Sequence, residues 1–508
     1  MCASLSLHQN MPIGGWRGVM NFTSKAVCAV LCSALLSACS KEAEPERLAA
    51  LLSEGLGAEK SAKADQRLAK ALDRGKTADQ REAAFGEMST PNGASSAASL
   101  INAALERNSR IGSAADGISL ADAERLNAIF GYLPQVSLSY TQDQVDQQVI
   151  ETDNVVFQEG QAQYPVTVLS ARIEQPIFDL SRIFAITYAS NARSQAEIDY
   201  VGTVRDVVYE VLDTYVTATQ SKARSRALRE RMRLLDRQVS SQNVLSDTGL
   251  AQIGEPDALR SERSSLASEE ALEAARYSGA LGQLSMLTGV VVRDVENFNV
   301  PSGAIGTERR QNVETLVEQG LRENPKMMSA ALSVVGSDIE RKQAIAADFS
   351  PVLEAYATLE QETRDASRFG GGSKTQDQVV GVQLSIPLFN ASGTGYATST
   401  SSIKLRQKAL EYYSLERQLE TDIRAAHARL GELSKAMSQA STAARQATSA
   451  VNSERRRVAA GESIDLAVSA REIRLAQVNE RRAFYQAEYV RTWLKLQYLT
   501  GVDLRQGF

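Results

Sequence analysis

The sequence repeats itself once at an interval of about 210 residues, which limits the chain to folds built from two similar halves. Leu-Thr-Gly at 287–289 recurs at 499–501, and Gln-Pro-Ile-Phe-Asp at 175–179 recurs as Ile-Pro-Leu-Phe-Asn at 386–390. Single-residue matches keep the same order, with Leu105, Asn108, Ala128, Ile129 and Pro134 corresponding to Leu321, Asn324, Ala344, Ile345 and Pro351. Each match is weak alone, but their shared order predicts a duplicated structure.

Each half has the same predicted plan: a helix, a strand pair, a very long helix and a shorter helix. The strands are indicated by side chains that alternate between apolar and polar types with a period of two. The apolar positions are Val136, Leu138, Tyr140, Leu169, Ala171, Ile173, Leu353, Ala355, Ala357, Leu359, Val380, Val382, Leu384 and Ile386. This pattern fits a barrel wall with lipid outside and water inside, and also a half-buried sheet in a soluble protein. The polar connections at 142–163 and 361–377 are predicted to be loops.

The turns from strand to long helix contain Pro176, Phe178, Pro387 and Phe389. Proline cannot donate to a strand ladder, so the two prolines are predicted to end the strands. The long helices are predicted at 180–247 and 394–460, and each would span about 100 Å. Helices of about half that length, predicted at 98–131, 257–288, 311–347 and 465–500, could stack end to end beside them.

A heptad of apolar residues runs from Leu419 to Val458 in the second long helix, and only Glu454 interrupts it. Such spacing is typical of helices that pack along a shared seam. Taken alone, the heptad favours an ordinary coiled-coil spacer.

The four cysteines are all near the N-terminus, at positions 2, 28, 32 and 39. A positive segment with Arg17 and Lys25 precedes a short apolar run, 26–36, which is typical of a cleaved secretion signal. The sequence Leu-Ser-Ala-Cys ending at Cys39 resembles the bacterial lipobox, which implies that Cys39 is acylated and becomes the first mature residue. An ordinary soluble-secretion signal is the alternative.

Composition argues against several classes of protein. The formal charge of -5 gives no basic surface for nucleic acid. The two histidines, His8 and His427, are far apart, so a histidine metal site or a Ser/His/Asp triad has almost no raw material. We therefore expect no enzyme activity, no cofactor and no metal, and His427 is expected to be a packing or polar position on a helix.

Four amphipathic strands in one chain cannot close a barrel in a membrane, because an open edge leaves unpaired backbone groups in lipid. Closure needs further copies, and three copies would supply twelve strands. Two or four copies would also close, so these arguments leave the number of copies open.

The order of the elements, the Pro-Ile/Leu-Phe-Asp/Asn turns, the two Leu-Thr-Gly segments and the lipobox together resemble the TolC-type outer membrane factor family. The resemblance covers about residues 98–508. It implies a mainly helical homotrimer, with a twelve-stranded barrel in the outer membrane and a helical tunnel through the periplasm. It also implies docking to a periplasmic adaptor and to an inner-membrane efflux pump or ABC transporter.

In that family the closed end of the tunnel lies where long helices turn into short ones. The resemblance places Gly249 and Leu250 at one such tip and Gly461 at the other, all as candidate adaptor contacts. It places Asp465 in an acidic ring at the aperture, where converging carboxylates would attract cations. The plainer interpretation of Asp465 is a helix N-cap after the Gly461 turn. Arg455, Arg456 and Arg457 are expected to form a solvated or intersubunit ion-pair face.

These predictions divide the chain into a signal peptide (1–38), a lipidated tether (39–97), a first repeat (98–288), an equatorial linker (289–310) and a second repeat (311–508). The expected function is passive export through the outer membrane, for small-molecule efflux. The alternatives are a duct for type I protein secretion and, from another class, a coiled-coil envelope lipoprotein that forms no channel.

Overall fold

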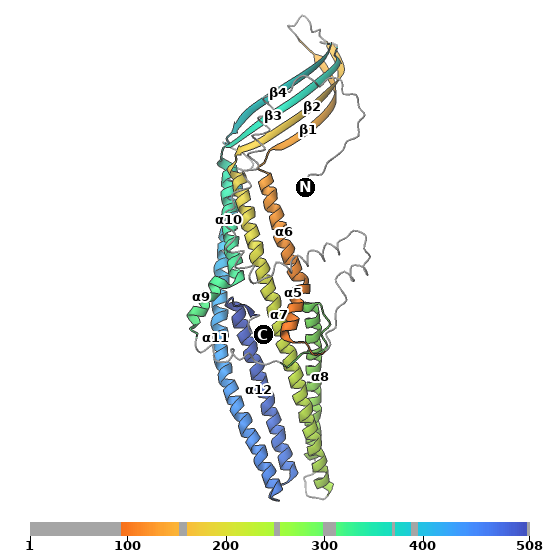
Figure 1. Ribbon diagram of the computed structural model, residues 1–508, viewed down its shortest axis with the longest axis vertical. Coiled ribbons are helices and arrows are strands. Elements are labelled where there is room, and N and C mark those ends of the chain that lie inside the picture. The colour runs from red at the N-terminus through yellow and green to blue at the C-terminus, as the bar shows by residue number, and fades with distance from the viewer. Residues whose placement is uncertain are drawn as a thin grey trace. The chain divides into compact units, whose positions relative to one another are not determined.

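The structure is a computed structural model that describes residues 93–151, 160–247, 255–297, 311–367, 371–387 and 395–504. These residues all belong to one compact unit of the chain. Its elements, in order, are α5 (Ala97–Arg107), α6 (Ser109–Phe130), β1 (Gln135–Val149), β2 (Gly160–Phe178), α7 (Leu180–Asp247), α8 (Glu255–Thr288), α9 (Val313–Glu323), α10 (Pro325–Phe349), β3 (Val352–Ser367), β4 (Gly371–Ser385), α11 (Tyr396–Ala459) and α12 (Asp465–Leu499). The predicted plan of helix, strand pair, long helix and shorter helix is therefore present in both halves (Figure 1).

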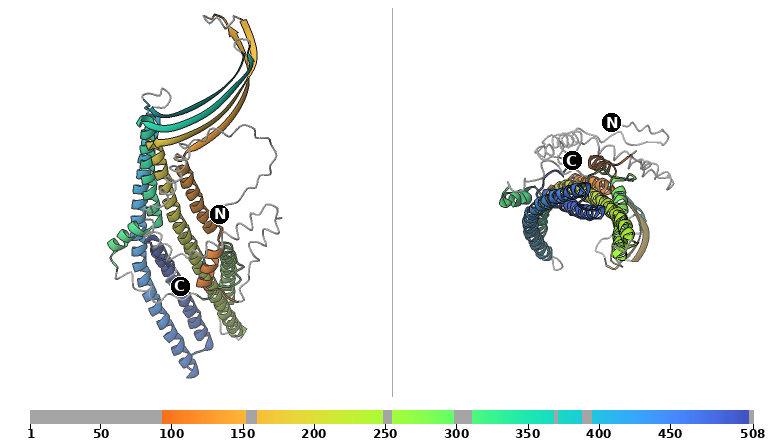
Figure 2. Two further views of the ribbon diagram at one scale, coloured as in Figure 1. Left: turned by 45° about the horizontal axis from the view of Figure 1, so that its top comes forward. Right: turned by 90° about the horizontal axis from the view of Figure 1, so that it is seen from below.

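The helices pack side by side in a single curved layer, which is clearest when it is viewed from below (Figure 2). Above mid-height the order across the layer is α6, α7, α10, α11, and below it is α8, α7, α12, α11. The long helices α7 and α11 thus run the full height, and each shorter pair is stacked beside them. At mid-height, α9 and the ends of α10 and α12 pack on α11 around Met327, Ile423, Leu430 and Tyr489.

The helix predicted before each strand pair is two helices, which corrects the single segments expected at 98–131 and 311–347. α5 ends and α6 begins at Asn108, and α9 ends and α10 begins at Asn324. Each asparagine is extended rather than helical, and its side-chain oxygen caps the second helix. The helical periodicity continues across both breaks, so the apolar pattern gave no sign of them.

The four strands form one antiparallel sheet in the order β1-β2-β3-β4, with β2 and β3 joining the two halves. Within the described residues, β1 and β4 are each hydrogen-bonded along one edge only. The strands run far into the segments predicted as loops, since β1 continues to Val149 and β4 begins at Gly371. That prediction was wrong because ladder hydrogen bonds are made by the backbone and continue where the side-chain pattern turns polar.

No helix in the described ranges has an apolar stretch long enough to span a membrane.

Candidate functional site

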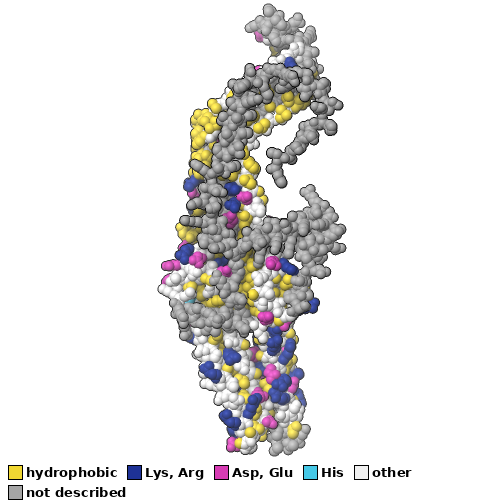
Figure 3. Space-filling model, viewed as in Figure 1, with side chains coloured by type: hydrophobic (Ala, Val, Ile, Leu, Met, Phe, Trp, Pro, Cys, Tyr) yellow, Lys and Arg dark blue, Asp and Glu magenta, His cyan; other side chains and the backbone are white. Residues whose placement is uncertain are grey.

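The sheet has one strongly apolar face. Pairing in register puts Leu138 beside Ala171 and Val136 beside Ile173. The same face continues across β3 and β4, where Ala357 pairs with Val380 and Leu353 pairs with Leu384. Most of the large apolar side chains on this face are exposed: Leu138 is 74% accessible and Val380 is 84% accessible. Hydrophobic side chains gather over the strands and upper helices, whereas charged ones concentrate on the lower helices (Figure 3).

The apolar face ends along an oblique line. Its last members are Tyr140 and Leu169, which pair with each other, then Leu359 and Val380. Leu359 pairs with Ala171, two positions nearer the helices than Leu169, and Val380 lies two positions nearer again. A slip of about 13 Å over three strand spacings of about 4.8 Å gives a tilt of roughly 40°. Sheets that span membranes tilt their strands by about this angle.

The opposite face of the sheet is polar near the helices. In β3 the residues that alternate with the apolar ones include Glu354, Tyr356, Glu360 and Glu362, and Tyr356 pairs with Glu174 of β2. Arg172 forms an ion pair with Glu174 on this face. The sheet thus separates an apolar side from a wettable side, as the sequence predicts.

The strand-to-helix turn of the first half is held by a dense set of hydrogen bonds. β2 passes through Pro176 with an irregular register and ends at Phe178, so Pro176 does not itself end the strand. Buried Asp179 accepts from the Arg182 amide at 3.1 Å and so caps α7. Of the matching residues in the second half, exposed Pro387 lies two positions beyond the end of β4, and Phe389 lies outside the described residues.

The stacked helices are joined by equivalent asparagines. Asn108 donates to the carbonyl of Leu287 at 2.8 Å, and Asn324 donates to the carbonyl of Leu499 at 3.0 Å. The duplicated Leu-Thr-Gly segments therefore end α8 and α12 directly against the caps of α6 and α10. Gly289 and Gly501 follow with φ of 65° and 89°, which suits glycine.

Two further groups at mid-height were not predicted. Arg205 of α7 donates to the carbonyls of Gly501, Tyr498 and Val502 at the end of α12, and burial lowers the pKa of this guanidinium. Asp294 accepts from both Lys222 and Tyr277, and these bonds hold the pKa of its carboxyl below the usual value despite burial. Single polar residues without a repeat or motif gave no signal of these contacts.

The lower tip of the second half is a complete helix stop. Gly461 has φ of 73°; its amide donates to Val458, and the next amide, that of Glu462, donates to Arg457. This pair of hydrogen bonds is the Schellman motif, whose left-handed backbone conformation favours glycine at this position. Asp465 is exposed and is the first residue of α12, whereas Ile464 occupies the N-cap position. The N-cap interpretation of Asp465 is therefore wrong, although a carboxylate in the first turn still suits the helix dipole.

Glu454, the residue that breaks the heptad, fastens this tip. It is 6% accessible, and it accepts from the Ser463 hydroxyl at 2.5 Å and from Arg457 at 3.3 Å. The Ser463 hydrogen bond is the main cause that holds the pKa of Glu454 below its usual value, with Arg457 assisting. The available signal in the sequence was a charged residue at a core position of the heptad, but this signal did not predict what Glu454 does. The three arginines are exposed, and at least one of them makes its ion pair within the chain, because Arg455 pairs with Glu472 at 2.6 Å.

Four predicted site residues lie outside the described residues: Cys39, Gly249, Leu250 and Phe389. The structure thus places Gly461, Asp465 and Glu454 at one tip, and it places Pro176, Phe178 and Pro387 at the end of the sheet that is nearest the helices. His427 lies on α11, as expected for a helical position.

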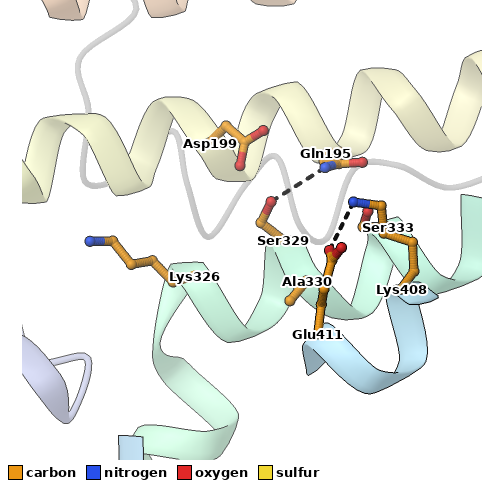
Figure 4. A pocket seen from close by; sticks show the side chains of 8 residues that line it. All are labelled: Gln195, Asp199, Lys326, Ser329, Ala330, Ser333, Lys408 and Glu411. Atoms are coloured by element: carbon orange, nitrogen blue, oxygen red, sulfur yellow. Dashed lines mark hydrogen bonds and ion pairs between the residues drawn. The ribbon is translucent and has the colours of Figure 1, made fainter. Parts of the chain in front are cut away.

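A polar groove of about 260 Å³ lies over α10, between α7 and α11 (Figure 4). Ser329, Ala330 and Ser333 form its floor, and Gln195 reaches Ser329 at 3.5 Å. Lys408 pairs with Glu411 at 2.8 Å. The groove is therefore a hydrophilic hollow whose lining carries two lysines and two acidic residues. Its lining residues do not form an acid–base pair or an activated nucleophile.

Comparison with known proteins finds similarity to outer membrane and secretion proteins. Residues 316–502 match the family model described as outer membrane efflux protein. The alkaline protease secretion protein AprF of Pseudomonas aeruginosa is 23% identical over 399 residues, 73% of this chain and 77% of the relative. The outer membrane protein TolC of Vibrio cholerae is 20% identical over 356 residues, 68% of this chain and 76% of the relative.

Among solved structures, the CmeC outer membrane channel of Campylobacter jejuni superposes with a TM-score of 0.66 at 15% identity. The match covers 80% of this chain and 85% of that chain. At this identity the likeness establishes the fold: a small sheet and a helical layer of the kind found in TolC-like channels.

Proposed function

Because the chain belongs to the TolC-type family of outer membrane efflux and secretion factors, we propose that it is one subunit of an outer membrane channel. Solutes would pass through it passively, from a periplasmic adaptor and an inner-membrane pump or ABC transporter to the outside. The observation that carries this proposal is the four-stranded sheet, with its exposed apolar face and, within the described residues, two edges that lack partner strands.

An unpaired strand edge in lipid costs several kcal/mol for each exposed backbone group, so the two edges must be sealed by other copies. Three copies give twelve strands and place the polar faces of all sheets around a shared space. The helices below continue each sheet as a curved layer, and three such layers would form a tunnel. The homotrimer and the twelve-stranded barrel are therefore part of this proposal.

The remaining sequence predictions belong to the same proposal. Cys39 would carry the lipid anchor, and residues 39–97 would link that anchor to the first repeat. Gly461, Gly249 and Leu250 would contact the adaptor. Asp465, which is exposed at the tip, would contribute one carboxylate of three to the aperture.

Single-channel recording in a planar lipid bilayer tests the proposal. Purified protein should produce uniform conductance steps, and Asp465→Asn should reduce the preference for cations over anions. Glu462→Gln, which removes another exposed carboxylate from the same turn, is the control. A preparation that inserts into the bilayer without conducting would overturn the channel assignment.

A second candidate function is a duct for protein secretion. It is favoured by the relative AprF, which is named as an alkaline protease secretion protein. A deletion strain distinguishes the two functions. Loss of a secreted protein with unchanged resistance to a panel of toxic compounds would establish secretion, and the reverse result would establish efflux.

A further inference from the structure

A second hollow lies where the helices meet the sheet. It has a volume of about 330 Å³ and is bounded by the first two turns of α7 and the last turns of α10. Its lining is nearly all apolar, and consists of Leu180, Phe184, Lys342, Ile345, Ala346, Phe349 and Ser350. We call this hollow the upper notch.

The upper notch opens on the same side as the apolar face of the sheet. Arg182 of α7 approaches Glu354 to 3.9 Å, and Glu354 is on the polar face. Leu180 and Phe184 are each two positions from Arg182, which places them on nearly the opposite side of the helix. Phe349, which is 54% accessible, extends the exposed apolar surface of β3 down to the notch.

Charged side chains lie directly below the notch on α10. Lys342 lines the notch, is about half exposed, and pairs with Asp338 at 2.8 Å, and Arg341 also pairs with Asp338 at 2.8 Å. α10 rises toward the sheet, so Asp338, Arg341 and Lys342 lie farther from the sheet than Ile345 and Phe349. The charge nearer the sheet, Asp348, accepts from Gly395 and Thr398 at the start of α11. The surface therefore changes from charged to apolar along one helix.

We propose that the upper notch binds one phospholipid of the membrane leaflet nearest the helices, with an acyl chain between Phe184 and Phe349. The lipid phosphate would lie beside Lys342, and a headgroup ammonium would lie beside Asp338. The inference rests on the proposed membrane location of the sheet, and names a lipid partner for that region.

Three features favour a phospholipid. The notch is continuous with the face that would contact lipid, so an acyl chain enters it without crossing water. The neighbouring cation and carboxylate match the two charges of a zwitterionic headgroup such as phosphatidylethanolamine. Aromatic rings at the edge of an apolar band, here Phe349 and Phe184, are typical of membrane interfaces.

Native mass spectrometry of the full-length protein, purified in mild detergent and titrated with dioleoylphosphatidylethanolamine, tests the inference. We expect one tightly bound lipid per chain. Lys342→Glu should weaken binding about tenfold or more, and so should Ile345→Trp, which fills the notch while it keeps the surface apolar. Lys404→Glu is the matched control, because Lys404 is a similarly exposed lysine that pairs with Glu340 of α10.

Binding that Lys342→Glu and Ile345→Trp both leave unchanged would overturn the inference, and so would the absence of bound lipid. Lipid binding that appears only after Cys39→Ser would also overturn it, because the chain's own acyl group would then be the occupant. Conductance of the wild-type preparation keeps the two proposals apart. Conductance without bound lipid would reject the notch alone, whereas bound lipid without conductance would reject the channel.

Discussion

Asn108 and Asn324 each use both ends of one amide group. The amide oxygen accepts from the first turn of the upper helix; at Asn324 the donor is the backbone amide of Lys326, at 2.9 Å. The amide nitrogen donates to a carbonyl at the end of the helix below. Two helix ends that meet would otherwise leave amides and carbonyls without partners. These residues therefore make stacked helices compatible with burial, and Asn324 is only 5% accessible.

We expect Asn324→Ala to lower the free energy of unfolding by about 2–3 kcal/mol, because it removes a cap and leaves a buried carbonyl unpaired. Asn312→Ala, which removes the exposed cap of α9, should cost about 1 kcal/mol or less. Guanidinium unfolding followed by circular dichroism measures both. Equal losses for the two variants would show that the bond to Leu499 contributes nothing.

Glu454 provides a test that depends on pH. Because its pKa is lowered in the folded chain, its contribution is present above the unfolded value of 4.5 and is lost as pH falls through the folded value. Protection of the 460–464 amides from hydrogen exchange, corrected for intrinsic rates, should therefore fall below about pH 4.5. Glu454→Gln should lower protection at neutral pH and remove this dependence. Glu462→Gln should retain both, and identical profiles for all three proteins would contradict the role of Glu454.

Among the elements, the strands show where sequence alternation stops being informative. Residues near the helices alternate between apolar and polar types, so the face on which each lies was predictable from the sequence. Farther along, Gln142 and Gln144 replace apolar residues on the face of Leu138, and the strand continues with no side-chain signal. Backbone pairing with β2 maintains it, and pairing with a distant segment is not visible in a local pattern.

Substitution by arginine should have different effects on the two faces of the sheet. Leu138→Arg should destabilise the membrane-inserted protein by about 2–4 kcal/mol, because it places a charge on the lipid side. Ser139→Arg, one residue on, points to the polar side and should be nearly neutral. The fraction of protein that resists heat or urea in outer membranes reports the difference. A similar loss for both variants would refute the assignment of the faces.

Two glycines should respond differently to replacement by alanine, one at the junction after α12 and one inside α7. At Gly501, φ is 89° and an added Cβ would be 2.6 Å from the Cβ of Glu323, so Gly501→Ala should cost about 2–3 kcal/mol or more. At Gly202, inside α7, an added Cβ would meet Pro325 at an ordinary 3.5 Å. Gly202→Ala should then raise stability by about 0.5–1 kcal/mol through helix propensity. Thermal melts of both variants test this, and a destabilising Gly202→Ala would show tighter packing than described.

For the whole molecule, duplication determined the order of the elements and hence the helical layer. The tip was less accessible to sequence reasoning. Gly461 and Asp465 were found by their resemblance to a family. Glu454 was missed because a charged residue does not fit the heptad pattern, and Arg205 was missed because it contacts residues far from it along the chain. The same holds for the upper notch, which joins the start of α7 to the end of α10 across some 160 positions.

In the proposed barrel, β1 and β4, the outer strands of the sheet, pair with neighbouring copies. Ser139→Cys on β1, combined in turn with a cysteine at Asp377, Val379 or Gly381 of β4, tests it by oxidation in intact cells. The control pair, Ser139→Cys with Ser170→Cys, joins register partners within one chain. We expect covalent dimers and trimers on a denaturing gel for at least one β1–β4 pair, with no larger species, and monomers for the control. A control that oxidises while every β1–β4 pair stays monomeric would contradict it.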